Sequence, residues 1–509
     1  MSGEHTAVET GSGLAPWGRA DLPHPPPTQG FSLLAVIGPG AIILGLSIGS
    51  GEWLIGPAAF VKYGLSLLWV TSVAVFLQTV LNTELMRYTL YTGEPAVTGF
   101  MRTPPNSTFW AWFYTGLYFL HVGWPAWAAN AAGACFLLLF RRVPASGDAG
   151  TIYWLGVGTF LGTVFILLFG KRIERTLEIL NWVLIIFIVG GMALLCLIFF
   201  APAVWYAALA GYFGFDVRSN QFNFIPAGAD WFLIGAFAAY SGAGGVSNLM
   251  LSNWARDKGF GMGSVVGYIP AAVGGHKVKL AHSGSVFPLT PDNLSRWRQW
   301  WRIVQIDQWA VFFVGAILGM GLPAILYTIF ITPGRDIRDL AIAAELANAI
   351  QAQSGPLLGG LVALMSAWVL FKTQLDNVDG FVRALTDILW TGSERLRRVA
   401  DVRVLYYGLL ALLVAFGVVA LRLTRPIILL QMAANIAGAV MVISALHILY
   451  VNVKFLPVEL RPPMWRRAAL VAMAVFYGFF VYLWLMGGFT PNPEKGFLFQ
   501  LPKLLKGLH

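Results

Sequence analysis

Charged residues and cysteines are scarce in this sequence. Only 11% of its 509 residues are charged, whereas 57% are hydrophobic. A water-soluble globular domain has about 25% charged residues, so the composition excludes that class and predicts a multi-pass membrane protein. The two cysteines, Cys135 and Cys196, lie in apolar stretches, which excludes an extracellular disulfide framework.

Motifs of catalysis are missing as well. The sequence contains no phosphate-binding loop, no zinc-ligand cluster and no Ser/His/Asp arrangement, so we expect neither an enzyme nor a cofactor. Without a nucleotide site, any transport would be secondary and driven by gradients. The net charge of +10 suits loops that face an anionic leaflet better than it suits nucleic acid. The expected partners are therefore the lipid bilayer and an ion or small-molecule substrate; the oligomeric state stays open.

The first thirty residues lack an apolar core and a cleavage site. They are polar and end in the proline-rich stretch Pro23 to Pro27. We therefore predict a disordered cytoplasmic tail over residues 1–30 and not a signal peptide.

Long apolar runs fill most of the remaining chain. They predict about eleven membrane-spanning helices. Placing the N-terminus inside puts about two thirds of the lysines and arginines on one side, which favours a cell-membrane protein with a cytoplasmic N-terminus. The predicted spans are 31–62, 65–89, 108–140, 152–170, 177–210, 229–252, 309–332, 355–376, 403–421, 426–452 and 466–488.

Two of these spans contain small residues at mid-depth. In span 1, Gly49, Ser50 and Gly51 weaken the helix and are followed by Glu52, a carboxylate at membrane depth. In span 6, the run 241–248 holds three glycines and two serines. Close helix packing through small residues is the alternative explanation. Two such segments five spans apart favour an inverted-repeat transporter with broken helices 1 and 6.

This interpretation divides the chain into two repeats and additions. The expected units are the first repeat 31–210, the second repeat 229–452 with a cytoplasmic loop 253–308, an extra span 466–488 and a C-terminal tail 489–509.

Two polar segments near span ends carry weaker predictions. In the long loop, Trp297, Trp300, Trp301 and Val304 are spaced i, i+3, i+4, i+7 between arginines, which predicts an amphipathic helix in the headgroup layer. The alternative is a helix packed on the loop's own core. At the end of span 8, the acids of 376–379 indicate a solvated helix end more than a gate.

Several motifs resemble the Nramp family of divalent-metal transporters. They include Gly38-Pro39-Gly40, the basic connector 171–175, the span 6 ending 248–253, Asp379-Gly-Phe-Val-Arg383 and Gln431 in span 10. The resemblance covers most of the membrane core. It implies an all-α, LeuT-like 5+5 inverted-repeat fold and metal-ion transport.

The metal site of that family does not carry over. Where the family has Asp-Pro-Gly-Asn, this chain has Gly49 to Glu52, and where the family has Met-Pro-His it has Gly245 to Ser247. The family's span 3 acids for proton release correspond to Trp127 and Asn130. Because the soft sulfur ligand is lost, the resemblance to a manganese or iron site fails here.

The rewritten pocket offers oxygen ligands and empty space. Oxygen ligation suits a hard cation such as Mg²⁺ or Ca²⁺, with Glu52 as the candidate metal ligand. The predicted substrate-binding residues are Gly49, Ser50, Gly51, Glu52, Gly242, Gly245, Ser247, Asn248 and Gln431.

Alternatives stay open at each level. Glu52 could serve the dipole of a restarted helix, and Asn248 and Gln431 could be interhelical hydrogen bonds without a substrate. His121 fits a satisfied interior histidine better than a ligand. The whole chain could instead carry a small organic or anionic solute, or be a non-transporting sensor or scaffold.

Overall fold

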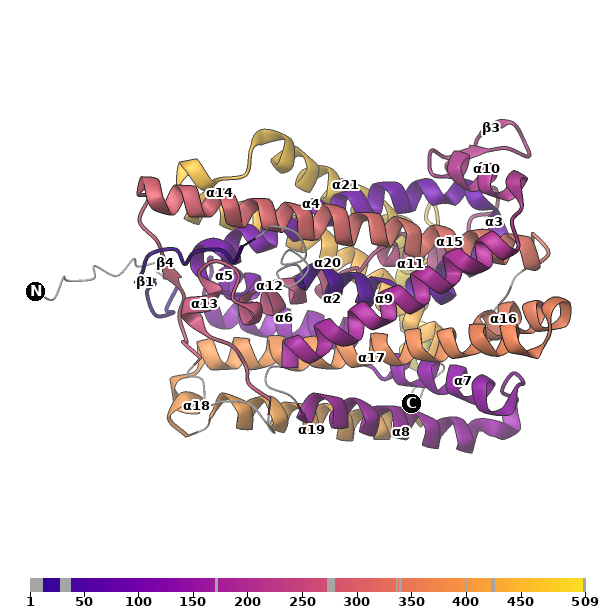
Figure 1. The fold of residues 1–509 in the computed structure, drawn as a ribbon, viewed down its shortest axis with the longest axis horizontal. Helices are drawn as coiled ribbons and strands as arrows, with labels where there is room; N and C mark the ends of the chain where they lie inside the picture. The colour runs from indigo at the N-terminus through magenta and orange to yellow at the C-terminus, as the bar shows by residue number, and fades with distance from the viewer. Residues whose placement is uncertain are drawn as a thin grey trace, which may run out of the picture.

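The computed structural model describes residues 12–27, 38–169, 173–271, 280–335, 337, 341–399, 401–422 and 426–506. Helices make up most of it, and most run roughly along the long axis of the molecule (Figure 1). In these residues ten helices are long and apolar enough to cross a membrane, and the shorter apolar α11 begins an eleventh, broken span. This agrees with the predicted number of spans.

The first half of the chain contains five spans. Their helices are α2 (Pro39–Ser47), η1 (Gly51–Ile55) and α3 (Gly56–Tyr63); η2 (Leu65–Leu67) and α4 (Leu68–Thr92); α6 (Ser107–Val122) and α7 (Ala126–Phe140); α8 (Ala149–Leu168); and α9 (Ile173–Ile198). The short connecting elements are α5 (Ala96–Met101), η3 (Ser146–Asp148), α10 (Pro202–Gly211), β2 (Phe215–Asp216) and β3 (Gln221–Phe222).

The second half repeats the pattern and adds one span. Its spans are α11 (Trp231–Tyr240) with α12 (Val246–Lys258); α14 (Pro291–Gln305), η4 (Ile306–Phe313) and α15 (Val314–Phe330); α17 (Pro356–Gly392); α19 (Val402–Ala420); α20 (Pro426–Phe455); and α21 (Met464–Met486). The connecting elements are α13 (Gly263–Val266), β4 (Ser285–Val286), α16 (Ala341–Ser354), α18 (Glu394–Val399), η5 (Val458–Leu460) and the C-terminal α22 (Phe497–Lys506).

Burial separates central from peripheral spans. The apolar window of the first span is 100% buried, whereas only 28% of the windows in α8 and α19 is buried inside the protein. Apolar side chains on α8 and α19 are therefore free to face lipid, because hydrocarbon solvates them as well as protein does. The first span, which carries Glu52, lies at the centre of the bundle.

A third break interrupts span 3, which we predict as one continuous helix. The helix α6 ends at Val122 and α7 starts at Ala126, after Gly123, Trp124 and Pro125. Proline fits the start of a helix but not its interior, because it lacks the N–H donor that an interior position needs. Gly123 and Pro125 are a sequence signal for this break, but the apolar run 108–140 that contains them is long enough to be predicted as one helix.

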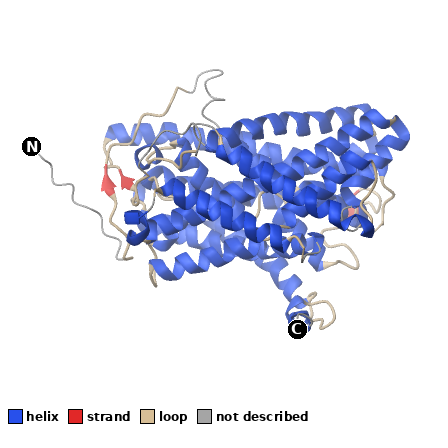
Figure 2. Cartoon of the chain, turned by 90° about the horizontal axis from the view of Figure 1, so that it is seen from below, coloured by secondary structure: helices blue, strands red, loops and turns tan. Residues whose placement is uncertain are grey.

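The N-terminal tail needs a correction. Residues 12–27 are folded and not disordered: Gly18–Arg19 forms the strand β1, which pairs in parallel with β4 (Figure 2). Trp17 and Leu22 are buried, and the Trp17 ring meets Phe455 edge to face. The tail therefore acts as a strap across one end of the bundle, which we call the β1–β4 end.

The loop helix was predicted with the right amphipathic pattern but the wrong neighbours. The helix α14 continues without a gap into η4 and α15. Its Trp297 and Trp300 are buried, and Trp300 Nε1 donates to the Pro23 carbonyl at 2.9 Å. The apolar face thus packs against protein, including the N-terminal strap, and its buried tryptophans are not free to contact lipid headgroups.

Candidate functional site

The break in span 1 places Glu52 in contact with both broken helices. The helix α2 ends at Ser47, and the chain restarts as a π-helical turn at Gly51. The Glu52 side chain is fully buried, and its Oε1 accepts from Ser47 Oγ at 3.1 Å. The other oxygen accepts from the Gly49 N–H at 3.2 Å, and Oε1 also lies 3.4 Å from the Gly242 amide. One carboxylate therefore joins the two breaks.

The break in span 6 is held by a side chain from span 2. Gln78 on α4 donates to the Ser241 carbonyl at 2.8 Å and accepts from the Gly244 N–H at 3.2 Å. Backbone groups freed by a break inside a membrane need such partners. Gly242 adopts φ +106°, a conformation that favours glycine, and a Cβ there would lie 2.6 Å from Gln78 Oε1.

A small cavity lies between the two breaks. Its water-accessible volume is about 10 Å³, which is close to the room of one water molecule. The Asn377 Oδ1 atom in its wall is buried and has no hydrogen-bond partner among the described residues. A buried polar atom without a partner is costly, so an occupant of the cavity would satisfy it. The lining consists of Leu46, Ser47, Ser50, Gly51, Trp127, Tyr240, Gly242, Ala243, Ser247, Thr373 and Asn377.

The predicted site residues differ in how closely they approach this cavity. Ser50, Gly51, Gly242 and Ser247 line it. Glu52 is not part of the lining but accepts a hydrogen bond from the lining residue Ser47. The other two predicted glycines pack closely against neighbouring side chains, with no room for a Cβ. A Cβ at Gly49 would lie 2.6 Å from Thr373 Oγ1, and one at Gly245 would lie 2.8 Å from His121.

The two predicted amides lie away from the cavity. Asn248 donates to Asn82 Oδ1 at 2.8 Å and lies 3.4 Å from Gln78, an interhelical contact of the kind that the alternative explanation describes. Gln431 is only half-buried and is not part of the lining.

His121 is a satisfied interior histidine in the described structure. One ring nitrogen lies 3.0 Å from the Tyr240 hydroxyl, and the other accepts from the Val246 N–H at 3.3 Å. Both nitrogens are thus used by the span 6 break. Within the described residues, no group of three or more His, Cys, Asp or Glu side chains could hold a metal ion.

Toward the β1–β4 end, the acids of span 8 are buried in ion pairs, which corrects the predicted solvated helix end. Arg383 pairs with Asp379 at 2.8 Å and with Asp257 of α12. Asp379 also accepts from Tyr406 at 2.6 Å and from Trp254 at 2.9 Å. This network fastens α12 to α17 and α19.

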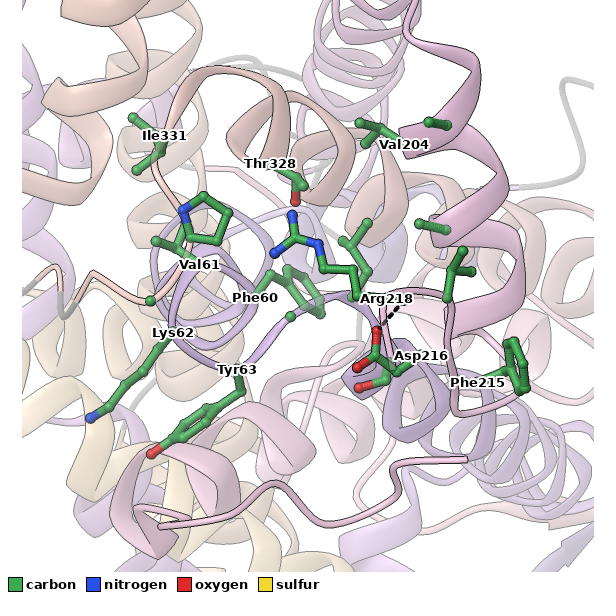
Figure 3. A pocket seen from close by; sticks show the side chains of 18 residues that line it. Phe60, Val61, Lys62, Tyr63, Val204, Phe215, Asp216, Arg218, Thr328 and Ile331 are labelled. Atoms are coloured by element: carbon green, nitrogen blue, oxygen red, sulfur yellow. Dashed lines mark hydrogen bonds between the residues drawn. The ribbon is translucent and has the colours of Figure 1, made fainter. Parts of the chain in front are cut away.

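A larger cavity, of about 350 Å³, lies elsewhere, at the far end of α3 (Figure 3). Its wall combines Phe60 and Ile331 with Arg218 and Asp216, and Asp216 accepts from the Arg218 backbone N–H at 3.0 Å. None of the predicted site residues lines it. Size alone would favour this cavity, but the broken helices and the buried carboxylate mark the smaller one.

Several residues of the site were not predicted from the sequence. The predicted site residues include none of Gln78, Thr373 and Asn377. Polar residues inside a long apolar helix are a usable signal, but span 8 carries several of them. Only the packing of α17 against the breaks shows which ones face the cavity.

No family model matches the chain, and no curated protein matches it either. Among solved structures, two mutants of the Eremococcus coleocola manganese transporter are similar, with 15% identity, 94% of each chain covered and TM-scores of 0.65 and 0.63. Mhp1, a nucleobase-cation-symport-1 family transporter solved with bromovinylhydantoin bound, has 12% identity and a TM-score of 0.51 over 88% of this chain and 90% of its own. These likenesses show the fold and confirm the predicted all-α, LeuT-like architecture.

Proposed function

We propose that this chain is a secondary transporter that moves a cation across the membrane by alternating access. The cation would bind between the two helix breaks, beside Glu52. The observation that carries this proposal is the environment of that carboxylate: it is fully buried, and among the described residues no lysine or arginine pairs with it.

The physical reason is the cost of a lone buried charge. An ionised carboxylate without a counter-charge is strongly destabilised in a low-dielectric interior, so it takes up a proton or a cation. Ion-coupled transport uses this property, because the net charge of the site differs between its empty and its loaded state. Glu52 also contacts both breaks, so a change in its charge acts on the helix ends at both breaks at once.

The chemistry of the cavity supports a hard cation such as Mg²⁺ or Ca²⁺. Apart from the Trp127 indole and the Asn377 amide nitrogen, the polar side-chain atoms of the lining residues are oxygens, from Ser47, Ser50, Tyr240, Ser247, Thr373 and Asn377. No thioether or free imidazole lines it, and soft ligands of that kind would favour a transition-metal ion over Mg²⁺ or Ca²⁺.

The size of the cavity bears on the organic-solute alternative. Room for about one water molecule fits an ion that has lost most of its hydration shell. An organic solute would need the walls to separate, although Trp127 and Tyr240, whose rings stack 5.8 Å apart at the cavity, could contact one. The same fold carries ligands of both kinds, as the similar structures indicate by their names.

The test is cation uptake into proteoliposomes. Wild-type protein should take up Mg²⁺ or Ca²⁺ in preference to Mn²⁺, and Glu52→Gln should reduce uptake at least about 10-fold, which corresponds to ~1.4 kcal/mol. Glu459→Gln, which changes an exposed glutamate, is the matched control and should have no effect.

Other outcomes identify the alternatives. Preferential Mn²⁺ uptake would contradict the oxygen-ligand argument, and equal uptake by Glu52→Gln would remove Glu52 from the mechanism. No ion flux, with thermal stabilisation by a small metabolite, would favour the organic carrier. Neither flux nor stabilisation by any ligand would favour a sensor or scaffold.

A further inference from the structure

A second charged group lies at the centre of the bundle and is not used by the proposed cation path. Lys372 and Asp376 occupy successive turns of α17, and both are buried and joined by an ion pair. Neither lines the cavity between the breaks. Charged side chains at membrane depth are rare, and they commonly mark ion sites.

The pair lies beside an amide side chain from a second helix, α9. Asn181 on α9 donates its amide to Asp376 at 3.4 Å and to the Leu177 carbonyl at 2.8 Å. Its Oδ1 is buried and has no hydrogen-bond partner among the described residues. This oxygen and the Lys372 ammonium both lie beside the same point, the position that a Cβ on Gly45 would take.

Gly45 brings the first span into the same arrangement. A Cβ at Gly45 would lie 2.5 Å from Lys372 Nζ and would overlap the Asn181 amide oxygen. Only a residue without a side chain allows the ammonium and the amide to reach the backbone of α2. The ammonium is thus surrounded by α2, α9 and α17, which are parts of spans 1, 5 and 8.

The neighbouring charges have partners of their own. Asp379, one turn further along α17, pairs with Arg383, and Glu178, one turn before Asn181 on α9, pairs with Lys258 and Arg175. The Lys372 ammonium therefore has one acid to neutralise, and it makes one ion pair among the described residues, with Asp376.

We propose that Lys372 acts as a tethered monovalent cation: its ammonium pairs with Asp376 and fills a cation site that Asn181 Oδ1 and Gly45 of α2 border. A lysine ammonium is a compact point charge on a flexible stem. It can therefore occupy the place of a dissolved monovalent cation. The site holds the first half of span 1 against spans 5 and 8 without a free ion. It does not depend on the identity of the transported substrate.

The experiment removes the tether and supplies a free cation. Lys372→Ala leaves Asp376 buried and uncompensated, which is strongly destabilising, and it opens space where the ammonium was. We expect the thermal midpoint of this variant in detergent to fall in choline chloride. It should rise by several degrees when choline is replaced at equal ionic strength by methylammonium, with Na⁺ and K⁺ compared in the same series.

Three controls define the result. Wild-type protein and Lys454→Ala, in which an exposed lysine is removed, should not respond to the choice of cation. The double variant Lys372→Ala/Asp376→Asn should fold and should not respond either, because the acid that attracts the ion is gone. If Lys372→Ala is recovered only when it is purified in methylammonium, sodium or potassium, the recovery itself supports the site.

The proposal is overturned by any of three outcomes. Lys372→Ala could be as stable in choline as the wild type, or it could be destabilised and respond to none of the small cations, including a failure to be recovered in any of them. The double variant could also show the same cation response as the single one. Because no transport is measured, the result is separate from the success or failure of the Mg²⁺ and Ca²⁺ uptake test.

Discussion

Buried acids in this protein fall into two groups. Most, such as Glu94 and Asp379, pair with arginine or lysine, whereas Glu52 and Asp307 make no ion pair among the described residues. These two resemble each other, because both accept backbone N–H groups of span 1. Asp307 accepts from Gly38 at 3.1 Å and from Gly40 at 2.8 Å, at the start of α2.

The difference between the two unpaired acids lies in what surrounds them. Asp307 lies at the N-terminus of α2, where the unpaired N–H groups and the helix dipole stabilise a negative charge. Glu52 lies just after a break and near a polar cavity. Its carboxylate contacts backbone amides at both breaks, those of Gly49 and Gly242. Asp307 is therefore explained by the structure of the helix alone, whereas the charge of Glu52 is left for a ligand or a proton.

The largest loss of stability should come from replacing a paired acid, and the other variants are compared with that loss. Glu94 accepts from the buried Arg102, so Glu94→Gln leaves an arginine uncompensated and should lower the free energy of unfolding by about 3–5 kcal/mol. Chemical unfolding in detergent measures this. Glu459→Gln, on the exposed surface, should change stability by less than ~0.5 kcal/mol.

The pH dependence of this pair has a defined sign. Burial acts to raise the pKa of Glu94, but Arg102 holds that pKa below its usual range. The pair therefore contributes fully above the pKa of an unfolded glutamate, about 4.3, and its contribution is lost as the pH falls through the lower folded value. The stability difference between wild type and Glu94→Gln should be constant from pH 8 to pH 5; a decline within that window would contradict the assignment.

The next largest effect should come from the neutral group that holds the second break beside Glu52. Gln78→Leu leaves the Ser241 carbonyl and the Gly244 N–H without their partner and should lower the free energy of unfolding by about 2–3 kcal/mol in all, since each group costs at least ~1 kcal/mol. Gln374→Leu is a matched control, because both polar atoms of the buried Gln374 side chain lack partners in the described structure. That change should be neutral or stabilising, and equal losses for the two variants would refute a special role for Gln78.

Replacing each of the two unpaired acids, Asp307 and Glu52, by its amide tests the difference between them directly. Asp307→Asn weakens two hydrogen bonds to a charged acceptor and should cost about 2 kcal/mol of stability. Glu52→Gln removes a lone buried charge, so stability should hold or rise while cation uptake is lost. The measurements are thermal midpoint and uptake per folded protein; the same pattern for both variants would show that the two acids do not differ.

The smallest effect should come from the cavity wall. Ser247→Ala removes one hydroxyl that lines the cavity. Stability should change by less than ~0.5 kcal/mol. The KM for the cation should rise about 2- to 5-fold, the cost of one neutral hydrogen bond of ~0.5–1 kcal/mol. An unchanged KM would place Ser247 outside the binding region.

The helix breaks show which features of the site the sequence pattern can predict. Glycine and serine at mid-depth predicted the positions at which α2 and α11 end, because a helix is weakest where side chains contribute least. The partners that satisfy those breaks come from distant parts of the chain. Gln78 is 163 residues from Ser241 along the sequence, and only the packing of α4 against α12 brings them together.

The strap and the amphipathic helix show the limit from the other side. Proline and polar residues in the tail predicted disorder, and the spacing of Trp297 and Trp300 predicted an apolar face. The strap and the helix α14 cover each other in the structure. Arg296 donates to the Leu22 carbonyl at 2.8 Å, and the Leu22 N–H donates to Asn293 at 3.1 Å. Complementary surfaces of two separate segments are not visible in either segment's pattern.

The amino-acid sequence by itself determined the membrane class, the number of spans and the places where two helices open, since these follow from hydropathy and local backbone preference. The tertiary structure alone decided which acids are paired, which side chains complete the breaks and how small the central cavity is. Charge balance and cavity size depend on distances between helices, and those distances arise only when the whole bundle packs.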